Sequence, residues 1–145
     1  MAHGSPDSPE EYVLEESRAL ELLTHLSRSD TGADTLVLGH THRQWCVSAE
    51  QGALPAHGRV QPRKAPLLIN PGSVGQSRER ERRPGARFAI YDSRSGYVDF
   101  FRVDYDVESS LAVLARLDLP STCLHAPPVL EKRLLGVLRR LQDRS

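Results

Sequence analysis

The chain has 145 residues, a length that suits one domain, and its 19 basic and 19 acidic side chains give a net charge of zero. This balance excludes a protein that binds nucleic acid through a bulk positive field, and no apolar run reaches the ~20 residues that span a bilayer. The two cysteines form no metal-type pair, which favours a reduced, cytoplasmic protein.

A helix is expected near the start of the chain. Ser8 is a suitable N-cap, Pro9 suits the first helical position, and Glu11 completes a capping box. Apolar residues between positions 13 and 26 keep a helical period, and Ser, Asp and Gly then gather over residues 27–31. The pattern predicts a helix that starts at the Ser8 cap and fades after residue 26.

Short apolar or alternating runs in the middle of the chain predict strands. They cover residues 35–38, 45–49, 59–61, 66–70, 87–91 and 97–103. Because these runs follow one another with short connections, we expect an antiparallel or mixed sheet rather than repeated βαβ units.

Two further helices are predicted towards the end of the chain, over 107–117 and 129–141. The second carries leucines at near-helical spacing, a pattern that favours core packing, with dimer contact as the alternative. The predicted fold class is therefore α/β (α+β), with short strands between an N-terminal helix and C-terminal helices. We expect a single domain over 1–145, with a sheet half at 1–104 and a helical segment at 105–145.

The strand predicted at 35–38 runs directly into Gly39-His40-Thr41-His42. In an extended backbone, alternate residues point to the same side, so the rings of His40 and His42 are expected to project together. Two imidazoles at the carboxyl end of a strand form a chelating pair for a transition metal. An H-x-H pair alone is a weak signal, and a pair without metal is the alternative.

Two other segments carry candidate site residues. His3 precedes the turn sequence Gly-Ser-Pro, although a histidine so near a terminus is more often a flexible residue. Asn70 ends the strand predicted at 66–70, and the turn after it can aim backbone N–H groups and the Asn70 amide at an anion. The alternative for this turn is a loop without a ligand. The charged run at 78–83 is interpreted as a solvated loop, with a flap over an anionic substrate as the weaker alternative.

The order of these motifs is more informative than any one of them. His-Gly-Ser-Pro at 3–6, Gly-His-Thr-His-Arg at 39–43, Asn-Pro-Gly-Ser-Val-Gly-Gln at 70–76 and Tyr-Asp-Val-Glu at 105–108 follow one another along the chain. This order resembles the carboxyl-terminal half of the calcineurin-like metallophosphoesterases, in particular their small bacterial and archaeal phosphodiesterase branch. The resemblance covers roughly residues 1–108 and implies a partial αββα sandwich.

The resemblance also implies a two-metal phosphoesterase that hydrolyses phosphomonoesters or phosphodiesters. In such enzymes the residues that match His3 and His40 bind one divalent ion, and the residue that matches His42 binds the other. Imidazole ligands suit manganese, iron, nickel or zinc, and two such ions clamp the phosphate and generate a hydroxide nucleophile. Arg43 and Asn70 are candidates for binding the phosphate-ester substrate, although an exposed ion pair is equally expected of Arg43.

The upstream motifs of that family, an Asp-x-His, a Gly-Asp-x-x-Asp and a Gly-Asn-His, do not occur in this sequence. They supply the bridging aspartate, the remaining ligands and a histidine that assists the leaving group. We therefore expect a fragment that is inactive alone and whose partner is a missing amino-terminal half. The alternatives are a non-catalytic remnant that acts as a binding module or forms a homo-oligomer through 129–141, and a mononuclear metal store or sensor.

Overall fold

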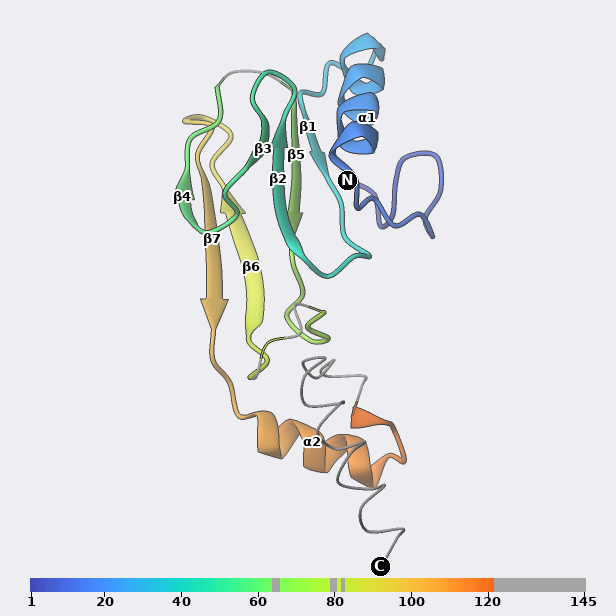
Figure 1. Ribbon diagram of the computed structural model, residues 1–145, viewed down its shortest axis with the longest axis vertical. Helices are drawn as coiled ribbons and strands as arrows, with labels where there is room; N and C mark the ends of the chain where they lie inside the picture. The colour runs from blue at the N-terminus through green and yellow to red at the C-terminus, as the bar shows by residue number, and fades with distance from the viewer. Residues whose placement is uncertain (64–65, 79–80, 82, 122–145) are drawn as a thin grey trace, which may run out of the picture.

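The computed structural model describes residues 1–63, 66–78, 81 and 83–121. Within these residues, two helices and seven strands follow in the order α1-β1-β2-β3-β4-β5-β6-β7-α2 (Figure 1). The helix predicted at 129–141 lies outside the described residues. No helix in the described part of the chain is long and apolar enough to cross a membrane.

Helix α1 (Glu16–Arg28) begins well after the predicted Ser8 cap. The carbonyl oxygen of Ser8 accepts the backbone N–H groups of Ser5 at 2.8 Å and of Glu11 at 3.3 Å, so it closes a local turn instead of starting a helix. The Glu11 carboxylate pairs with Arg18 at 2.7 Å instead of completing a capping box. The predicted start of this helix is therefore wrong, whereas its existence and its end are confirmed.

The first sheet has four strands in the order β1-β5-β2-β3. Their bounds are β1 (Thr35–Val37), β2 (Gln44–Ser48), β3 (Gly52–Leu54) and β5 (Leu67–Pro71). Strand β5 lies parallel to β1 and antiparallel to β2, so both of its edges are paired, and residues 67 to 70 are all buried. A central strand of this kind favours the apolar run that the sequence shows at 66–69, before Asn70.

The second sheet has three antiparallel strands in the order β4-β7-β6. Their bounds are β4 (Gly58–Val60), β6 (Ala86–Tyr91) and β7 (Val98–Val103). The hairpin of β6 and β7 confirms the strands predicted at 87–91 and 97–103. The two sheets face each other across an apolar core that contains Cys46, Leu67, Ile69, Val98 and Phe100.

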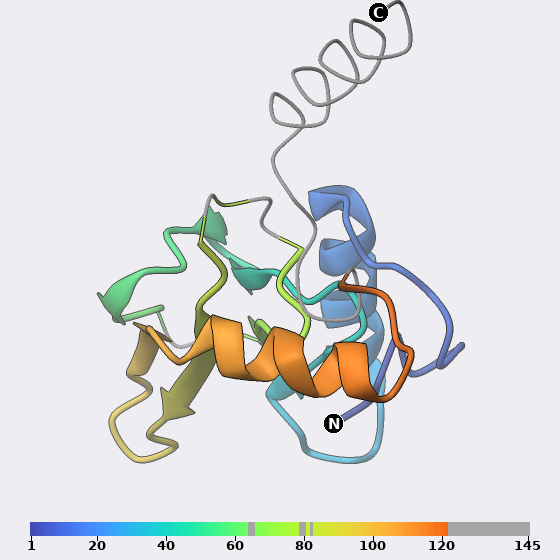
Figure 2. The same ribbon diagram turned by 90° about the horizontal axis from the view of Figure 1, so that it is seen from below.

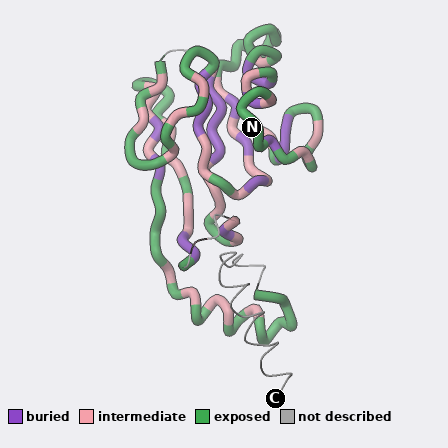
Figure 3. Tube along the Cα trace, viewed as in Figure 1, coloured by how far each residue is buried: buried purple, intermediate pink, exposed green. Residues whose placement is uncertain are grey.

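Helix α1 packs on the other face of the first sheet, so the described domain has three layers in the order helix, sheet, sheet (Figure 1 and Figure 2). This mixed content of helices and sheets confirms the predicted fold class. Figure 3 shows half-buried and exposed residues along much of the second sheet. Its outer face carries exposed apolar residues. They are Phe88, Ile90, Phe101 and Val103. Helix α2 (Val107–Arg116) extends from the end of β7 and has no buried residue.

The first residues of the chain run beside β1, on the edge that faces away from β5. The backbone N–H of Ala2 donates to the carbonyl oxygen of Val37 at 3.0 Å, and that of Gly39 donates to the carbonyl oxygen of His3 at 2.9 Å. These two bonds place His3 beside the residues that follow β1.

Candidate functional site

Two imidazole rings from distant parts of the sequence meet at the carboxyl-terminal end of β1. Nε2 of His3 lies 2.9 Å from Nδ1 of His40, and the two ring centroids are 4.7 Å apart. Ring nitrogens that face each other in this way either share a proton in a hydrogen bond or direct both lone pairs at one metal ion. The structure thus joins two of the three histidines that the sequence analysis selects.

The turn that carries the H-x-H motif has an unusual backbone. His40 and His42 both adopt left-handed conformations, with φ angles of 58° and 60°. The expectation that an extended backbone aligns their rings is therefore wrong. The turn is held from β5, because Nδ2 of Asn70 donates to the carbonyl oxygen of Gly39 at 2.8 Å and to Oγ1 of Thr41 at 2.9 Å. Left-handed conformations cost energy in residues that have a Cβ, so two of them in one turn indicate a constraint imposed by the surrounding fold.

His42 faces the loop that follows β5. Its Nδ1 lies 2.8 Å from the carbonyl oxygen of Gln76, and because a carbonyl only accepts, Nδ1 carries the hydrogen and Nε2 keeps its lone pair. Burial lowers the pKa of His42 below the ordinary histidine value; the bond to Gln76 acts against this, and the charges of Arg78, His40 and His3 lower the pKa further. His42 is therefore neutral at neutral pH, the form in which imidazole binds a metal.

Tyr12 and Arg78 pack against His40 from outside the predicted motifs. The ring centroids of Tyr12 and His40 are 4.0 Å apart, and Cζ of Arg78 lies 5.3 Å from the centroid of the Tyr12 ring. Nη1 of Arg78 donates to the carbonyl oxygen of His40 at 3.0 Å. No local pattern marks Tyr12, and the interpretation of the charged run as a solvated loop is wrong at Arg78, which is half-buried.

The two residues predicted to bind substrate differ in their surroundings. Arg43 is exposed and lines a cavity of about 200 Å³ together with Thr41 and Trp45. Asn70 is only 2% exposed, and its side chain makes three hydrogen bonds within the protein, since Oδ1 also accepts the backbone N–H of Gly72 at 3.0 Å. The amide NH2 group of Asn70 thus serves the turn that carries the histidines, and its Oδ1 serves the turn that follows β5.

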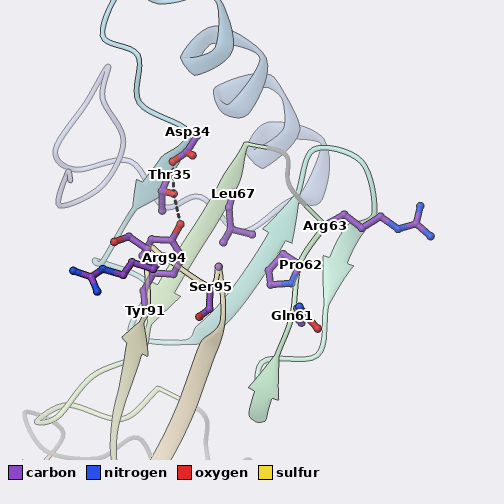
Figure 4. A pocket seen from close by; sticks show the side chains of 11 residues that line it. Asp34, Thr35, Gln61, Pro62, Arg63, Leu67, Tyr91, Arg94 and Ser95 are labelled. Carbon is purple, nitrogen blue, oxygen red and sulfur yellow. Dashed lines mark hydrogen bonds between the residues drawn. The ribbon is translucent and has the colours of Figure 1, made fainter.

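A larger cavity, of about 750 Å³, opens between the two sheets at the other end of β1 (Figure 4). The hydroxyl groups of Thr35 and Tyr91 lie 3.1 Å apart at its wall. The side chains of Arg63 and Arg94 extend away from its centre (Figure 4). None of the predicted site residues lines this cavity, so it is separate from the histidine cluster.

The distance between the facing ring nitrogens of His3 and His40 shows whether the two rings can bind one metal ion. Two nitrogens that bind the same ion at ~2.0–2.1 Å, with a right angle between the two bonds, lie ~2.9 Å apart. This is the distance observed between Nε2 of His3 and Nδ1 of His40. Within the described residues, however, no group of three or more His, Cys, Asp or Glu side chains is arranged to hold a metal ion. The histidine pair fits part of a metal centre, and the residues described do not complete one.

No protein-family model matches the chain. An uncharacterized protein of Methanocaldococcus jannaschii is 28% identical over 124 residues, which make up 83% of this chain and 46% of that protein. A metallophosphoesterase from Sphaerobacter thermophilus superimposes with a TM-score of 0.69 at 28% identity, and the match covers 82% of this chain and 49% of that structure.

A hypothetical protein from Pyrococcus horikoshii OT3 has the same fold, with a TM-score of 0.61 at 18% identity over 88% of this chain and 46% of that structure. In each of the three comparisons the chain spans less than half of its relative. The fold predicted from the motif order, part of a metallophosphoesterase domain, is therefore confirmed.

Proposed function

We propose that this chain, which has the fold of part of a metallophosphoesterase domain, supplies histidine ligands to a metal-dependent phosphoesterase. The observation that carries the proposal is the approach of His3 Nε2 to His40 Nδ1 at 2.9 Å across 37 positions of sequence. A fold that brings two imidazole nitrogens together from separate segments presents two ligands at a spacing that suits one divalent ion bound at a right angle.

In this proposal His3 and His40 hold one ion and His42 holds a second through Nε2. The ions are divalent manganese, iron, nickel or zinc, which neutral imidazole binds well. When bound, such ions neutralise the charge of a phosphate ester and activate a water molecule. The chain itself orients the ligands, because the Gln76 carbonyl selects the tautomer of His42 and Asn70 holds the turn between the two motif histidines.

The substrate class that fits this chemistry is a phosphomonoester or phosphodiester. We assign Arg43 to the rim of the substrate site, because it follows the ligand turn directly and its exposed guanidinium has no partner among the described residues. Asn70 has a supporting role at the same site, because its buried amide holds the turn that presents His40 and His42.

Completion of the centre requires carboxylates that the described residues do not place beside the histidines. A two-metal site needs a bridging oxygen ligand to hold two cations close together. We therefore propose that a further polypeptide segment provides this ligand, and that the chain of 145 residues hydrolyses no phosphate ester alone. The match to less than half of the metallophosphoesterase from Sphaerobacter thermophilus supports this view.

Isothermal titration of the purified chain with Ni²⁺ tests the ligand assignment. We expect one weak site that His40→Ala removes and that His25→Ala retains, because His25 is an exposed histidine of α1 remote from the cluster. A second arm assays bis(4-nitrophenyl) phosphate with Mn²⁺, using the chain extended by its upstream reading frame. Hydrolysis that survives replacement of both His40 and His42 by alanine would refute the assignment.

A non-catalytic binding or dimerisation module is the second candidate function. The observation in its favour is the exposed face of the second sheet, where Phe88 and Phe101 stack with centroids 4.9 Å apart and stay open to solvent. An apolar face of this kind favours association with another surface. Stable expression without metal binding, together with concentration-dependent self-association, would favour this candidate over the phosphoesterase.

A further inference from the structure

We propose that Arg78 binds the phosphate group of the substrate, and that Tyr12 holds its guanidinium in place. The proposal rests on the proposed function, since it assigns a residue to the same site. It adds a substrate-binding side chain that the order of motifs does not reveal, because neither residue belongs to the four motifs.

The position of Arg78 is set by two contacts with neutral groups. Its Nη1 donates to the carbonyl oxygen of His40 at 3.0 Å, and its Cζ lies 5.3 Å from the centroid of the Tyr12 ring. The Tyr12 ring in turn packs on His40, with centroids 4.0 Å apart. A cation over an aromatic face is attracted by the electron density of the ring, so Tyr12 orients the guanidinium without neutralising it.

Arg78 is half-buried, as Arg18 and Arg87 are, but it differs from them in having no carboxylate partner among the described residues. Four arginines of the described chain pair with carboxylates: Arg18 with Glu11, Arg59 with Asp99, Arg87 with Glu81 and Arg102 with Asp104. No carboxylate of the described residues forms an ion pair with Arg78. Because Arg78 is half-buried and, within the described part of the chain, is bound only through neutral groups, its positive charge is available to an anion beside the histidines.

The hydrogen-bonding capacity of Arg78 suits a phosphate group. A guanidinium has five N–H donors in a planar fork, and the bond to the His40 carbonyl uses a single nitrogen. The remaining donors match two phosphate oxygens in a bidentate arrangement. The anion would therefore lie against the same turn whose histidines are the proposed metal ligands, where a phosphoryl group must sit for hydrolysis.

The test measures binding of inorganic phosphate to the whole chain by isothermal titration, with and without Ni²⁺, and measures Ni²⁺ affinity separately. Arg78→Ala should weaken phosphate binding about 10- to 100-fold, the loss expected for charge-assisted hydrogen bonds, and change Ni²⁺ affinity less than about twofold. Arg78→Lys should restore part of the affinity, because it keeps the charge and loses the fork. The control Arg94→Ala removes an exposed arginine at the other cavity and should leave phosphate binding unchanged.

Tyr12 is tested by two variants. Tyr12→Phe keeps the aromatic face and should bind phosphate as the natural chain does, whereas Tyr12→Leu removes the cation–π contact and should weaken phosphate binding about threefold to tenfold. Equal binding by the two variants would remove Tyr12 from the proposal.

The outcomes separate this proposal from the phosphoesterase itself. Phosphate binding that does not depend on Arg78, or that is absent from the natural chain, overturns the inference. Equal losses of phosphate and Ni²⁺ affinity in Arg78→Ala also overturn it, since Arg78 would then be only a support for His40. If the natural chain binds no Ni²⁺ but binds phosphate through Arg78, the metal-dependent function fails and the anion site stands.

Discussion

The side-chain amide of Asn70 donates to Oγ1 of Thr41 at 2.9 Å and so ties the end of β5 to the turn that carries both motif histidines. The bond is buried, with Asn70 2% and Thr41 5% exposed. Its loss would leave polar atoms without partners in a place that water does not reach, and an unsatisfied buried group costs more than a hydrogen bond contributes.

Asn70→Ala should therefore lower the free energy of unfolding by about 2–4 kcal/mol, as measured by urea denaturation. It should also weaken Ni²⁺ binding by the folded chain about tenfold, because the turn that presents His40 is released. Leu68→Ala on the same strand is the matched control, since it should cost similar stability through a cavity and leave Ni²⁺ affinity intact. Equal Ni²⁺ affinities for the two variants would contradict a positioning role for Asn70.

The lowered pKa of His42 predicts a pH dependence of stability. An unfolded histidine titrates near pH ~6.5, and burial lowers the pKa of His42 in the folded chain, so the folded state binds fewer protons between the two values. The stability that neutral His42 provides is present above pH ~6.5 and is lost as the pH falls towards the folded pKa. Urea unfolding at about pH 8 and about pH 5.5 should show this loss.

His42→Gln should reduce that dependence on pH, whereas His25→Gln should keep it, because His25 is exposed on α1. A nuclear magnetic resonance titration of the imidazole ring gives the pKa of His42 directly. A value above that of a histidine in an unfolded peptide would show that burial does not govern this group.

Gly4 is required by the turn that positions His3. A Cβ at this residue would lie 2.6 Å from the carbonyl oxygen of Pro9 and 2.7 Å from that of Ser8. Backbone atoms cannot rotate out of the way, so Gly4→Ala must displace the turn. We expect a loss of about 1–3 kcal/mol in unfolding free energy and about tenfold weaker Ni²⁺ binding.

Gly75→Ala is the control for this change, because an added methyl group there meets nothing within 4 Å. It should keep both the unfolding free energy and the Ni²⁺ affinity of the natural chain. Retention of Ni²⁺ affinity by Gly4→Ala would mean that His3 is not held by this turn.

The exposed face of the second sheet predicts self-association. Phe88 and Phe101 are 36% and 38% exposed and stack on each other, and Ile90 is 55% exposed on the same strand as Phe88. Sedimentation velocity should show a larger particle as the concentration rises, and Phe88→Lys should restore the monomer without a loss of stability of more than about 1 kcal/mol. Glu108→Lys, a charge change on α2, is the control. A monomer at all concentrations would exclude this surface as a homo-oligomer interface.

Several features could be predicted from the sequence because they depend on local patterns. The apolar run that precedes Asn70 predicts a buried strand, and the runs at 87–91 and 97–103 predict a hairpin; both are present as β5 and as β6 with β7. The order of the four motifs predicts the fold shared with the metallophosphoesterase from Sphaerobacter thermophilus. The helix start at Ser8 was predicted wrongly, because a local turn through the Ser8 carbonyl replaces the cap.

The sequence alone determined which histidines are candidates, in what order they occur, and whether a strand or a helix lies beside each. The spacing of apolar residues and the choice of turn residues act between near neighbours, so they can be read without the fold. The geometry of the site was decided only by the tertiary structure. Three contacts join segments that are far apart in the sequence. They are the contact of His3 with His40, the hydrogen bond from Asn70 to the left-handed turn, and the cation–π contact of Arg78 with Tyr12. Such contacts depend on the path of the chain through the first sheet and the segments beside it, which no local pattern encodes.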